Sequence, residues 1–246
     1  MIESENQPWW PPPKGPTRII VPIVAKTLSE ALGQAIDAAL AEVDLVEWRV
    51  DYLESQYLNP GVLIEVAYEI GRIIAPKPLI FTWRTADEGG VAEPADDAGY
   101  AELLTAIIKS GAVDLVDIQF HHRAARQLAG LAHECKMPVI GSWHDITGTP
   151  SETEIGYELE DAEDFGASIV KIAVTARHEV DTESLLAATL ERALVAWVPI
   201  ITIAMGEAGL ISRLYGHFFG STATFASLNQ ASAPGQPSLD QLKAAW

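Results

Sequence analysis

Apolar residues in this chain occur in two alternating arrangements. Short runs rich in Val, Ile and Leu are typical of strands that are buried on both faces. They alternate with longer segments in which apolar residues recur every three or four positions, as in helices. The first such segment repeats Leu28, Leu32 and Ile36, with Thr27 or Ser29 available as its N-cap, and further helices are predicted over 62–74 and 97–110. The eight predicted strands cover residues 18–25, 45–52, 78–85, 113–120, 138–145, 168–175, 199–206 and 221–228.

The regular succession of these units predicts the fold. Strands begin roughly every thirty residues with helical segments between them, which is the order of a parallel sheet covered by helices. Eight units favour an α/β fold closed into an eight-stranded parallel β/α (TIM) barrel, for which ~250 residues is usual. An open doubly wound sheet is the alternative, but the turn V-A-K-T-L-S after the first strand has no glycine-rich loop. We therefore expect a flexible tail containing Trp and Pro over residues 1–17 and a single barrel domain over 18–246.

Composition and charge narrow the possible locations and partners. The 246 residues are 48% hydrophobic, yet no apolar run approaches the ~18 residues of a membrane span. The first residues lack the basic and apolar regions of a secretory signal, and Cys135 is the only cysteine. We therefore expect a cytoplasmic protein without an internal disulfide, in which Cys135 is a packing residue. The formal net charge of −18 argues against nucleic acid and anionic membranes as partners.

One charged residue interrupts the sixth apolar run. In S-I-V-K-I-A-V-T, Lys171 points inward if the strand lines a barrel, because side chains alternate along a strand. Burial and neighbouring cations lower the pKa of a lysine and produce a nucleophilic amine. We expect Arg49, Arg84 and Arg213 to be those cations. The alternative is a lysine near the strand end that lifts its charge into solvent.

Other polar residues stand at or just after predicted strand ends, which meet at one mouth of a barrel. Four of the 16 basic residues belong to this set, which suggests a positive pocket for an anionic small molecule. Each has a structural alternative: Glu47 and Arg49 could form a simple ion pair, and His144 could be a core histidine. Arg213 could be a solvated helix residue, and Ser232 and Gln236 could be ordinary turn residues. The candidates are Glu47, Arg49, Arg84, Glu88, His144, Lys171, Met205, Arg213, Ser232 and Gln236.

Five motifs carry a resemblance to a known family. They are E-W-R-V-D at 47–51, F-T-W-R-T-A-D-E-G-G at 81–90, S-W-H-D at 142–145, V-K-I-A-V at 170–174, and a C-terminal run with I-S-R-L-Y-G-H-F-F-G-S-T-A-T-F and A-S-A-P-G-Q. In this order and spacing they resemble the type I 3-dehydroquinate dehydratases of the shikimate pathway. The resemblance covers nearly the whole chain from Arg18 onward, and the family's fold is the barrel already predicted.

The resemblance implies dehydration of 3-dehydroquinate to 3-dehydroshikimate, in aromatic amino acid biosynthesis or quinate catabolism. Lys171 resembles the lysine that forms a Schiff base with the substrate ketone, and His144 resembles the group that removes a proton from the adjacent methylene. A protonated imine accepts the developing charge better than a ketone does. Glu88 resembles the loop carboxylate that supports the histidine. The substrate-binding residues by this resemblance are Glu47, Arg49, Arg84, Met205, Arg213, Ser232 and Gln236, with Arg213 clamping the substrate carboxylate.

Two positions depart from the family pattern, and other functions stay open. Pro22 stands where many members have a substrate-contacting serine, and where the fourth strand often ends in Asp-x-Glu this chain has Asp117 and Gln119. The alternatives are a class I aldolase on the same barrel and, in another class, a ligand-sensing barrel without activity. The sequence has no spaced Cys or His cluster, phosphate loop or dinucleotide motif, so we expect neither a metal nor a cofactor. The resemblance also implies a homodimer.

Overall fold

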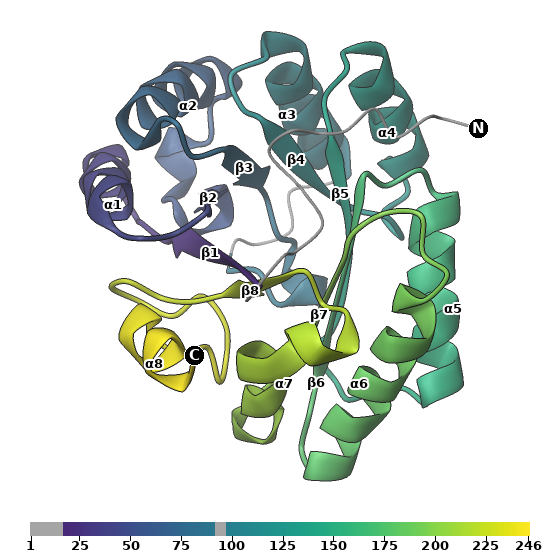
Figure 1. Cartoon of the computed structure of the whole chain (residues 1–246). Coiled ribbons are helices and arrows are strands. Elements are labelled where there is room, and N and C mark those ends of the chain that lie inside the picture. Colours follow the sequence, from purple (N-terminus) through teal and green to yellow (C-terminus); the bar gives the residue numbers. More distant parts are fainter. Residues whose placement is uncertain (1–16, 92–96) are drawn as a thin grey trace.

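The computed structural model describes residues 17–91 and 97–246, so residues 1–16 of the predicted tail lie outside the described residues. The chain forms an eight-stranded parallel barrel (Figure 1) with the strand order β7-β6-β5-β4-β3-β2-β1-β8. A parallel bridge between Ile200 and Ser221 brings the two end strands together, so the barrel is nearly closed. The strands are β1 (Arg18–Ile23), β2 (Leu45–Arg49), β3 (Leu79–Thr82), β4 (Leu115–Gln119), β5 (Val139–Asp145), β6 (Ile169–Thr175), β7 (Ile200–Met205) and β8 (Ala223–Phe225).

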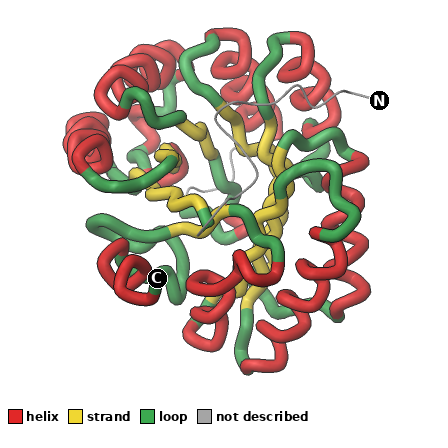
Figure 2. The backbone as a smooth tube through the Cα atoms, in the orientation of Figure 1, coloured by secondary structure: helices red, strands yellow, loops and turns green. Residues whose placement is uncertain are grey.

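Helices surround the strands, as Figure 2 shows in red around yellow. The first helix begins with the predicted cap, because the Thr27 side chain accepts from the backbone of Glu30 and Glu30 bonds back to complete a capping box. The predicted helix over 97–110 is confirmed with the same bounds. The helices are α1 (Leu28–Leu40), α2 (Pro60–Ile74), α3 (Asp97–Ser110), α4 (Ala125–Glu134), α5 (Glu152–Asp164), α6 (Glu179–Ala193), α7 (Leu210–Tyr215) and α8 (Leu239–Ala245).

The barrel interior consists of an apolar base and a polar layer above it. The base is a buried cluster to which neighbouring strands contribute one residue each, namely Leu45, Ile80, Leu115, Ile140 and Ile169. Because side chains alternate across a strand, the residue two positions further along each strand also faces inward. Those residues are all polar and buried: Glu47, Thr82, Asp117, Ser142 and Lys171. The fold therefore supports a ring of polar groups on an apolar floor, toward the carboxyl ends of the strands.

Three details differ from the predictions made from sequence. Strand β2 stops at Arg49, because the chain turns into a short 3-10 helix (Val50–Tyr52) in which Asp51 folds back onto the Arg49 guanidinium. Strand β8 has only three residues, where eight were predicted. Cys135 is exposed beyond the end of α4, so its prediction as a packing residue is wrong.

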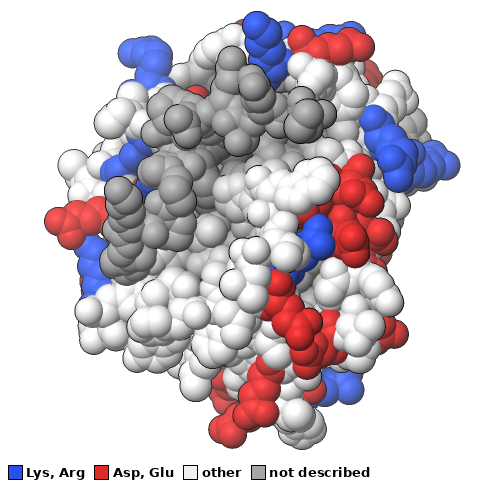
Figure 3. Space-filling view, turned by 45° about the vertical axis from the view of Figure 1, so that its right-hand side comes forward, with Lys and Arg blue, Asp and Glu red and all other residues white. Residues whose placement is uncertain are grey.

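The acidic surplus gathers on particular helices. Helix α5 reads E-T-E-I-G-Y-E-L-E-D-A-E-D, and Figure 3 shows carboxylates gathered on the side of the molecule that carries α5 and α6. Within residues 17–91 and 97–246, no helix combines the length and apolar character needed to cross a membrane.

Candidate active site

Lys171 lies inside the barrel, in the polar layer. Its side chain is 6% exposed, and Nζ is 3.3 Å from Glu47 Oε1 and 3.3 Å from Asp117 Oδ2. The predicted inward orientation is confirmed, and the alternative of a solvated lysine is wrong. The arginines expected as neighbouring cations are not its direct partners, because the β2 and β4 positions in the same layer are carboxylates. Phe225 adds an aromatic face, with Nζ 4.6 Å from the ring centroid.

Asp117 connects the charged groups of the polar layer. Its two carboxylate oxygens accept from Arg84 Nη2 at 2.8 and 2.9 Å, and Ser142 Oγ donates to Oδ1 at 2.5 Å. Burial alone would raise the pKa of Asp117, but Arg84 and Lys171 outweigh burial and lower it. The sequence interpretation treated Asp117 only as part of a departure from the family pattern. The signal was available, since Asp117 follows Leu115 by two positions and therefore faces inward.

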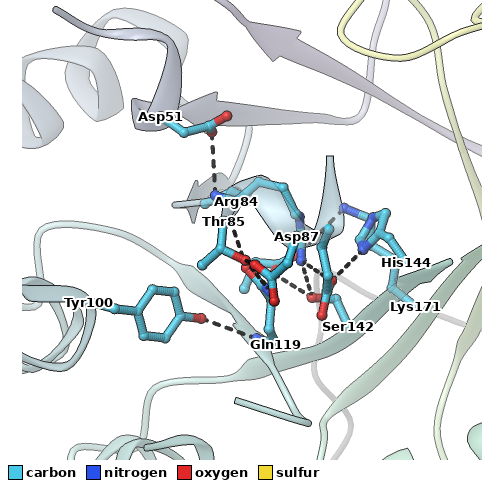
Figure 4. A network of polar contacts seen from close by, with 12 residues as sticks. Asp51, Arg84, Thr85, Asp87, Tyr100, Gln119, Ser142, His144 and Lys171 are labelled. Atoms are coloured by element: carbon cyan, nitrogen blue, oxygen red, sulfur yellow. Dashed lines mark hydrogen bonds and ion pairs between the residues drawn. The ribbon is translucent and has the colours of Figure 1, made fainter. Parts of the chain in front are cut away.

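His144 and Glu88 form a second part of the same network, in which Figure 4 labels His144. His144 Nδ1 lies 2.9 Å from Glu88 Oε2, which also accepts from Arg84 Nη1 at 2.9 Å. Burial raises the pKa of Glu88 to about 7, although Arg84 opposes the rise. Burial, followed by the charges of Arg84 and Lys171, holds the pKa of His144 well below its usual value. His144 is therefore a neutral imidazole at neutral pH, and Nε2 has no hydrogen-bond partner among the described residues.

Arg49 pairs with Asp51 and not with Glu47. Its Nε and Nη2 donate to the two Asp51 oxygens at 2.7 Å each. Burial alone would lower the pKa of Arg49, but the Asp51 carboxylate outweighs it and raises the pKa. Glu47 instead accepts from Thr82 Oγ1 at 2.9 Å and contacts Lys171. The simple Glu47–Arg49 ion pair is therefore wrong, and the Arg49 fork is held in one orientation beside the mouth.

Arg213 is a buried guanidinium without an acidic partner among the described residues. The residue is 1% exposed, Nη2 donates to Pro234 O at 3.2 Å, and Nε has no partner. Burial lowers the pKa of Arg213 to about 10. The alternative of a solvated helix residue is wrong. A buried cation with an unsatisfied donor and no acidic partner among the described residues favours an anionic ligand, because an unpaired charge in the interior is unfavourable.

The segment after β8 lies close to Arg213. The backbone N and Oγ of Ser232 donate to Gln236 Oε1 at 2.7 and 3.0 Å, while Gln236 Nε2 is buried and has no partner among the described residues. Tyr52, which follows β2, donates its hydroxyl to Ser232 O at 3.2 Å. Met205 ends β7 and belongs to the inner apolar cluster, against which Ala233 packs. This segment therefore joins the β2 and β7 sides of the mouth.

The ten predicted residues thus fall into two connected groups. Hydrogen bonds and ion pairs link Glu47, Arg84, Glu88, His144 and Lys171, with Arg49 beside them. The second group, on the β7–β8 side, consists of Met205, Arg213, Ser232 and Gln236. In the part of the chain that is described, no cluster of three or more His, Cys, Asp or Glu side chains could hold a metal ion.

The fold and this site define a β/α-barrel enzyme in which a buried amine, a neutral histidine and an unpaired arginine face one mouth. The chain belongs to the type I 3-dehydroquinase family, whose family model matches residues 19–246. Membership assigns the chain to the dehydratases of 3-dehydroquinate, which are hydro-lyases of the shikimate pathway.

Individual relatives are similar to this chain along most of their length. A 3-dehydroquinate dehydratase of Klebsiella pneumoniae is 40% identical over 233 residues, which cover 94% of this chain and 92% of the relative. The crystal structure of 3-dehydroquinate dehydratase from Geobacillus kaustophilus has a TM-score of 0.89 at 34% identity, covering 94% of this chain and 90% of that one. The type I enzyme of Clostridium difficile with covalently modified comenic acid has a TM-score of 0.87 at 36% identity, covering 94% and 91%.

Proposed function

We propose that this chain dehydrates 3-dehydroquinate to 3-dehydroshikimate through an imine on Lys171, with His144 as the general acid and base. The observation that carries the proposal is the position of Lys171, the one lysine that is buried among the residues described. Its Nζ lies above the apolar floor of the barrel, so a ligand that enters the mouth meets this amine.

The proposed steps conserve atoms and charge. The free amine of Lys171 attacks the ketone carbon, and loss of water gives a protonated imine. Nε2 of His144 removes a proton from the adjacent methylene, and the imine nitrogen accepts the electron pair to give an enamine. The enamine expels the hydroxyl, which leaves as water with a proton from His144. Water then hydrolyses the imine and releases the unsaturated ketone and the lysine.

The carboxylates near Lys171 fit this sequence. Glu47 and Asp117 hold the ammonium in place before the ligand arrives, each at 3.3 Å. Attack requires that the ammonium lose a proton, and the neutral imidazole of His144 is a base in the same network. A relative crystallised with a covalently modified comenic acid lends support to covalent chemistry in this family.

The substrate carboxylate is assigned to Arg213. The unpartnered Nε of Arg213 and the unpartnered Nε2 of Gln236 are two buried donors without an acceptor among the described residues. A carboxylate would satisfy such donors, and the planar guanidinium fork suits it. Ser232 fixes the Gln236 side chain, and Met205 contributes an apolar wall. Glu47, Arg49 and Arg84 are assigned to the ring hydroxyl side. The reaction as proposed needs no metal and no cofactor.

Reductive trapping tests the proposal. Borohydride added with 3-dehydroquinate should fix one ligand per chain as a secondary amine, and peptide mass mapping should find the adduct on Lys171. Lys171→Ala should lose both the adduct and dehydration, whereas Lys26→Ala should keep both. Lys26 is a suitable control because it follows β1 near the mouth but is exposed. An adduct on another lysine, or none while dehydration proceeds, would refute the imine on Lys171.

We also propose that the chain forms a homodimer through exposed apolar residues that follow α6 and α8 and that lie on and just after α7. We call this the C-terminal apolar surface; it comprises Leu194, Trp197, Ile211, Phe218 and Trp246. Three of these residues are largely exposed, with Leu194 at 80%, Trp197 at 86% and Phe218 at 72%. Phe218 and Trp246 both lie against the His217 ring, and large apolar side chains gathered on a protein surface mark interaction sites. Two copies with a net charge of −18 each repel one another, which favours contact through an uncharged surface such as this one.

Sedimentation equilibrium tests the dimer. Phe218→Asp places a charge in the C-terminal apolar surface and should give a monomer at concentrations where the unmodified chain is dimeric. Tyr157→Asp is the matched control, because Tyr157 is 63% exposed on α5, outside this surface. A monomeric unmodified chain, or a dimer that Phe218→Asp does not weaken, would contradict the proposal.

A further inference from the structure

Gln119 ends β4 beside the proposed active site. Its side chain makes two hydrogen bonds to Thr85, one as acceptor and one as donor. Its side chain is buried, with the residue 2% exposed. Oε1 accepts from the backbone N of Thr85 at 2.9 Å, and Nε2 donates to Thr85 Oγ1 at 2.8 Å. Figure 4 shows this pair next to Arg84, with Tyr100 on the other side of Gln119. The backbone N of Gln119 donates to the Tyr100 hydroxyl at 3.2 Å, which fixes the end of the strand.

The direction of these bonds matches an amide at position 119. The Thr85 hydroxyl donates its single proton to Asp87, so toward Gln119 it can only accept. An amide supplies both the acceptor for Thr85 N and the donor for Thr85 Oγ1, whereas a carboxylate has no donor. Gln119 is therefore matched to Thr85 at both atoms.

Thr85 in turn holds the segment that carries Glu88. The carbonyl of Thr85 accepts from the backbone N of Glu88 at 3.2 Å and of Gly90 at 2.8 Å. Glu88 then contacts His144 Nδ1 at 2.9 Å. A continuous chain of hydrogen bonds thus leads from Gln119 through Thr85 and Glu88 to the imidazole.

The neutrality of Gln119 matters because several charges already face Glu88. Arg84 and Asp87 lie on the same loop, Asp117 comes from β4, and His144 comes from β5. The Gln119 amide also lies close enough to Glu88 to lower the pKa of that carboxyl. A carboxylate in its place would add a further negative charge at short range and favour the protonated form of Glu88.

We propose that Gln119 is a positioning residue that holds the Thr85–Glu88 turn against His144 and keeps the local charge low enough for Glu88 to ionise. The expected effect of Gln119 on turnover rests on the proposed function, in which His144 is the acid and base. The expected effect of Gln119 on the Glu88 carboxyl does not. Among the described residues no hydrogen bond joins Gln119 to Lys171 or His144, so we assign its influence to Thr85 and Glu88.

Two variants separate the two parts of the proposal. Gln119→Glu keeps the shape and adds a charge, and the Glu88 carboxyl should then titrate about one pH unit higher by ¹³C NMR. Gln127→Glu adds the same charge at an exposed position of α4 and should leave the Glu88 titration unchanged. Gln119→Met removes both bonds without a charge, and backbone amides of residues 84–91 should exchange faster with solvent.

The outcomes distinguish this proposal from the proposed function. An unchanged Glu88 titration in folded Gln119→Glu, or unchanged exchange in Gln119→Met, would overturn the positioning role. If Gln119→Glu fails to fold, the exchange measurement on Gln119→Met decides the matter. We expect the acid limb of the kcat profile of Gln119→Glu to move upward with the Glu88 titration. A shifted titration with an unshifted profile would uphold the positioning role and count against the assigned role of the Glu88–His144 pair.

Discussion

Replacement of Glu88 by glutamine tests the physical basis of the site without relying on activity. The carboxyl of Glu88 is buried against Arg84 and His144, and burial raises its pKa from 4.5 to about 7. Glutamine has nearly the same shape and stays neutral at every pH. The variant therefore removes one buried ionisation from the folded state and leaves the packing almost unchanged.

The sign and size of the effect follow from proton linkage. Between pH 4.5 and pH 7 the folded chain holds the Glu88 proton more tightly than the unfolded chain does, so rising pH favours unfolding. This contribution to stability is fully present below pH 4.5 and is lost as the pH rises through about 7. The Glu88→Gln variant has no carboxyl at this position, so its free energy of unfolding does not fall over this pH range for this reason. The variant should therefore gain about 2.5 kcal/mol over the unmodified chain between pH 5 and pH 8, from ~1.4 kcal/mol per pKa unit.

Urea unfolding at pH 5, 6, 7 and 8 measures this difference. Both chains should carry His144→Gln, because His144 contacts Glu88 and its own pKa falls well below the usual value on folding, which would add a second pH dependence. Glu65→Gln is the control, since Glu65 is exposed on α2 and its replacement should give a difference that does not change with pH. A difference for Glu88→Gln that is equally flat, or that falls with pH, would refute the conclusion that burial dominates at Glu88.

Four further outcomes are expected. His144→Ala should fold and lose about 10² to 10⁴ in turnover, the usual contribution of a positioned acid or base; near-normal turnover in a steady-state assay would contradict the role. Arg213→Lys should bind the product acid about tenfold more weakly in a calorimetric titration, since the lost guanidinium geometry removes a charged hydrogen bond; equal affinity would exclude the clamp. Asp117→Asn should lower the free energy of unfolding by about 3 kcal/mol, because Arg84 and Lys171 lose their shared counterion; a change near zero in urea unfolding would show that the carboxylate is not needed. Dialysis against a chelator should leave turnover unchanged, and activity lost and then restored by a divalent ion would remove the imine mechanism from consideration.

The sequence alone was sufficient for the order of elements and for the side of each strand that faces inward. Alternation along β6 predicted that Lys171 points into the barrel, and capping chemistry offered Thr27 or Ser29 as the cap of α1, of which the structure uses Thr27. These features depend on residues within a few positions of one another, so local spacing determines them. The same reasoning applied to β4 would have placed Asp117 in the polar layer beside Lys171.

Contacts between distant residues were decided by the tertiary structure. Lys171 is 124 positions from Glu47 and 54 from Asp117, and only the register of the closed barrel brings these groups into one layer. Arg49 turned to Asp51, and Arg213 was left buried without a carboxylate among the described residues. The net electrostatics of a site depends on distances of 3 to 5 Å and on burial, which change the energy of a charge by several kcal/mol. Sequence spacing contains neither quantity, so the sequence indicated which residues meet at the mouth while the folded barrel determined which charges pair there.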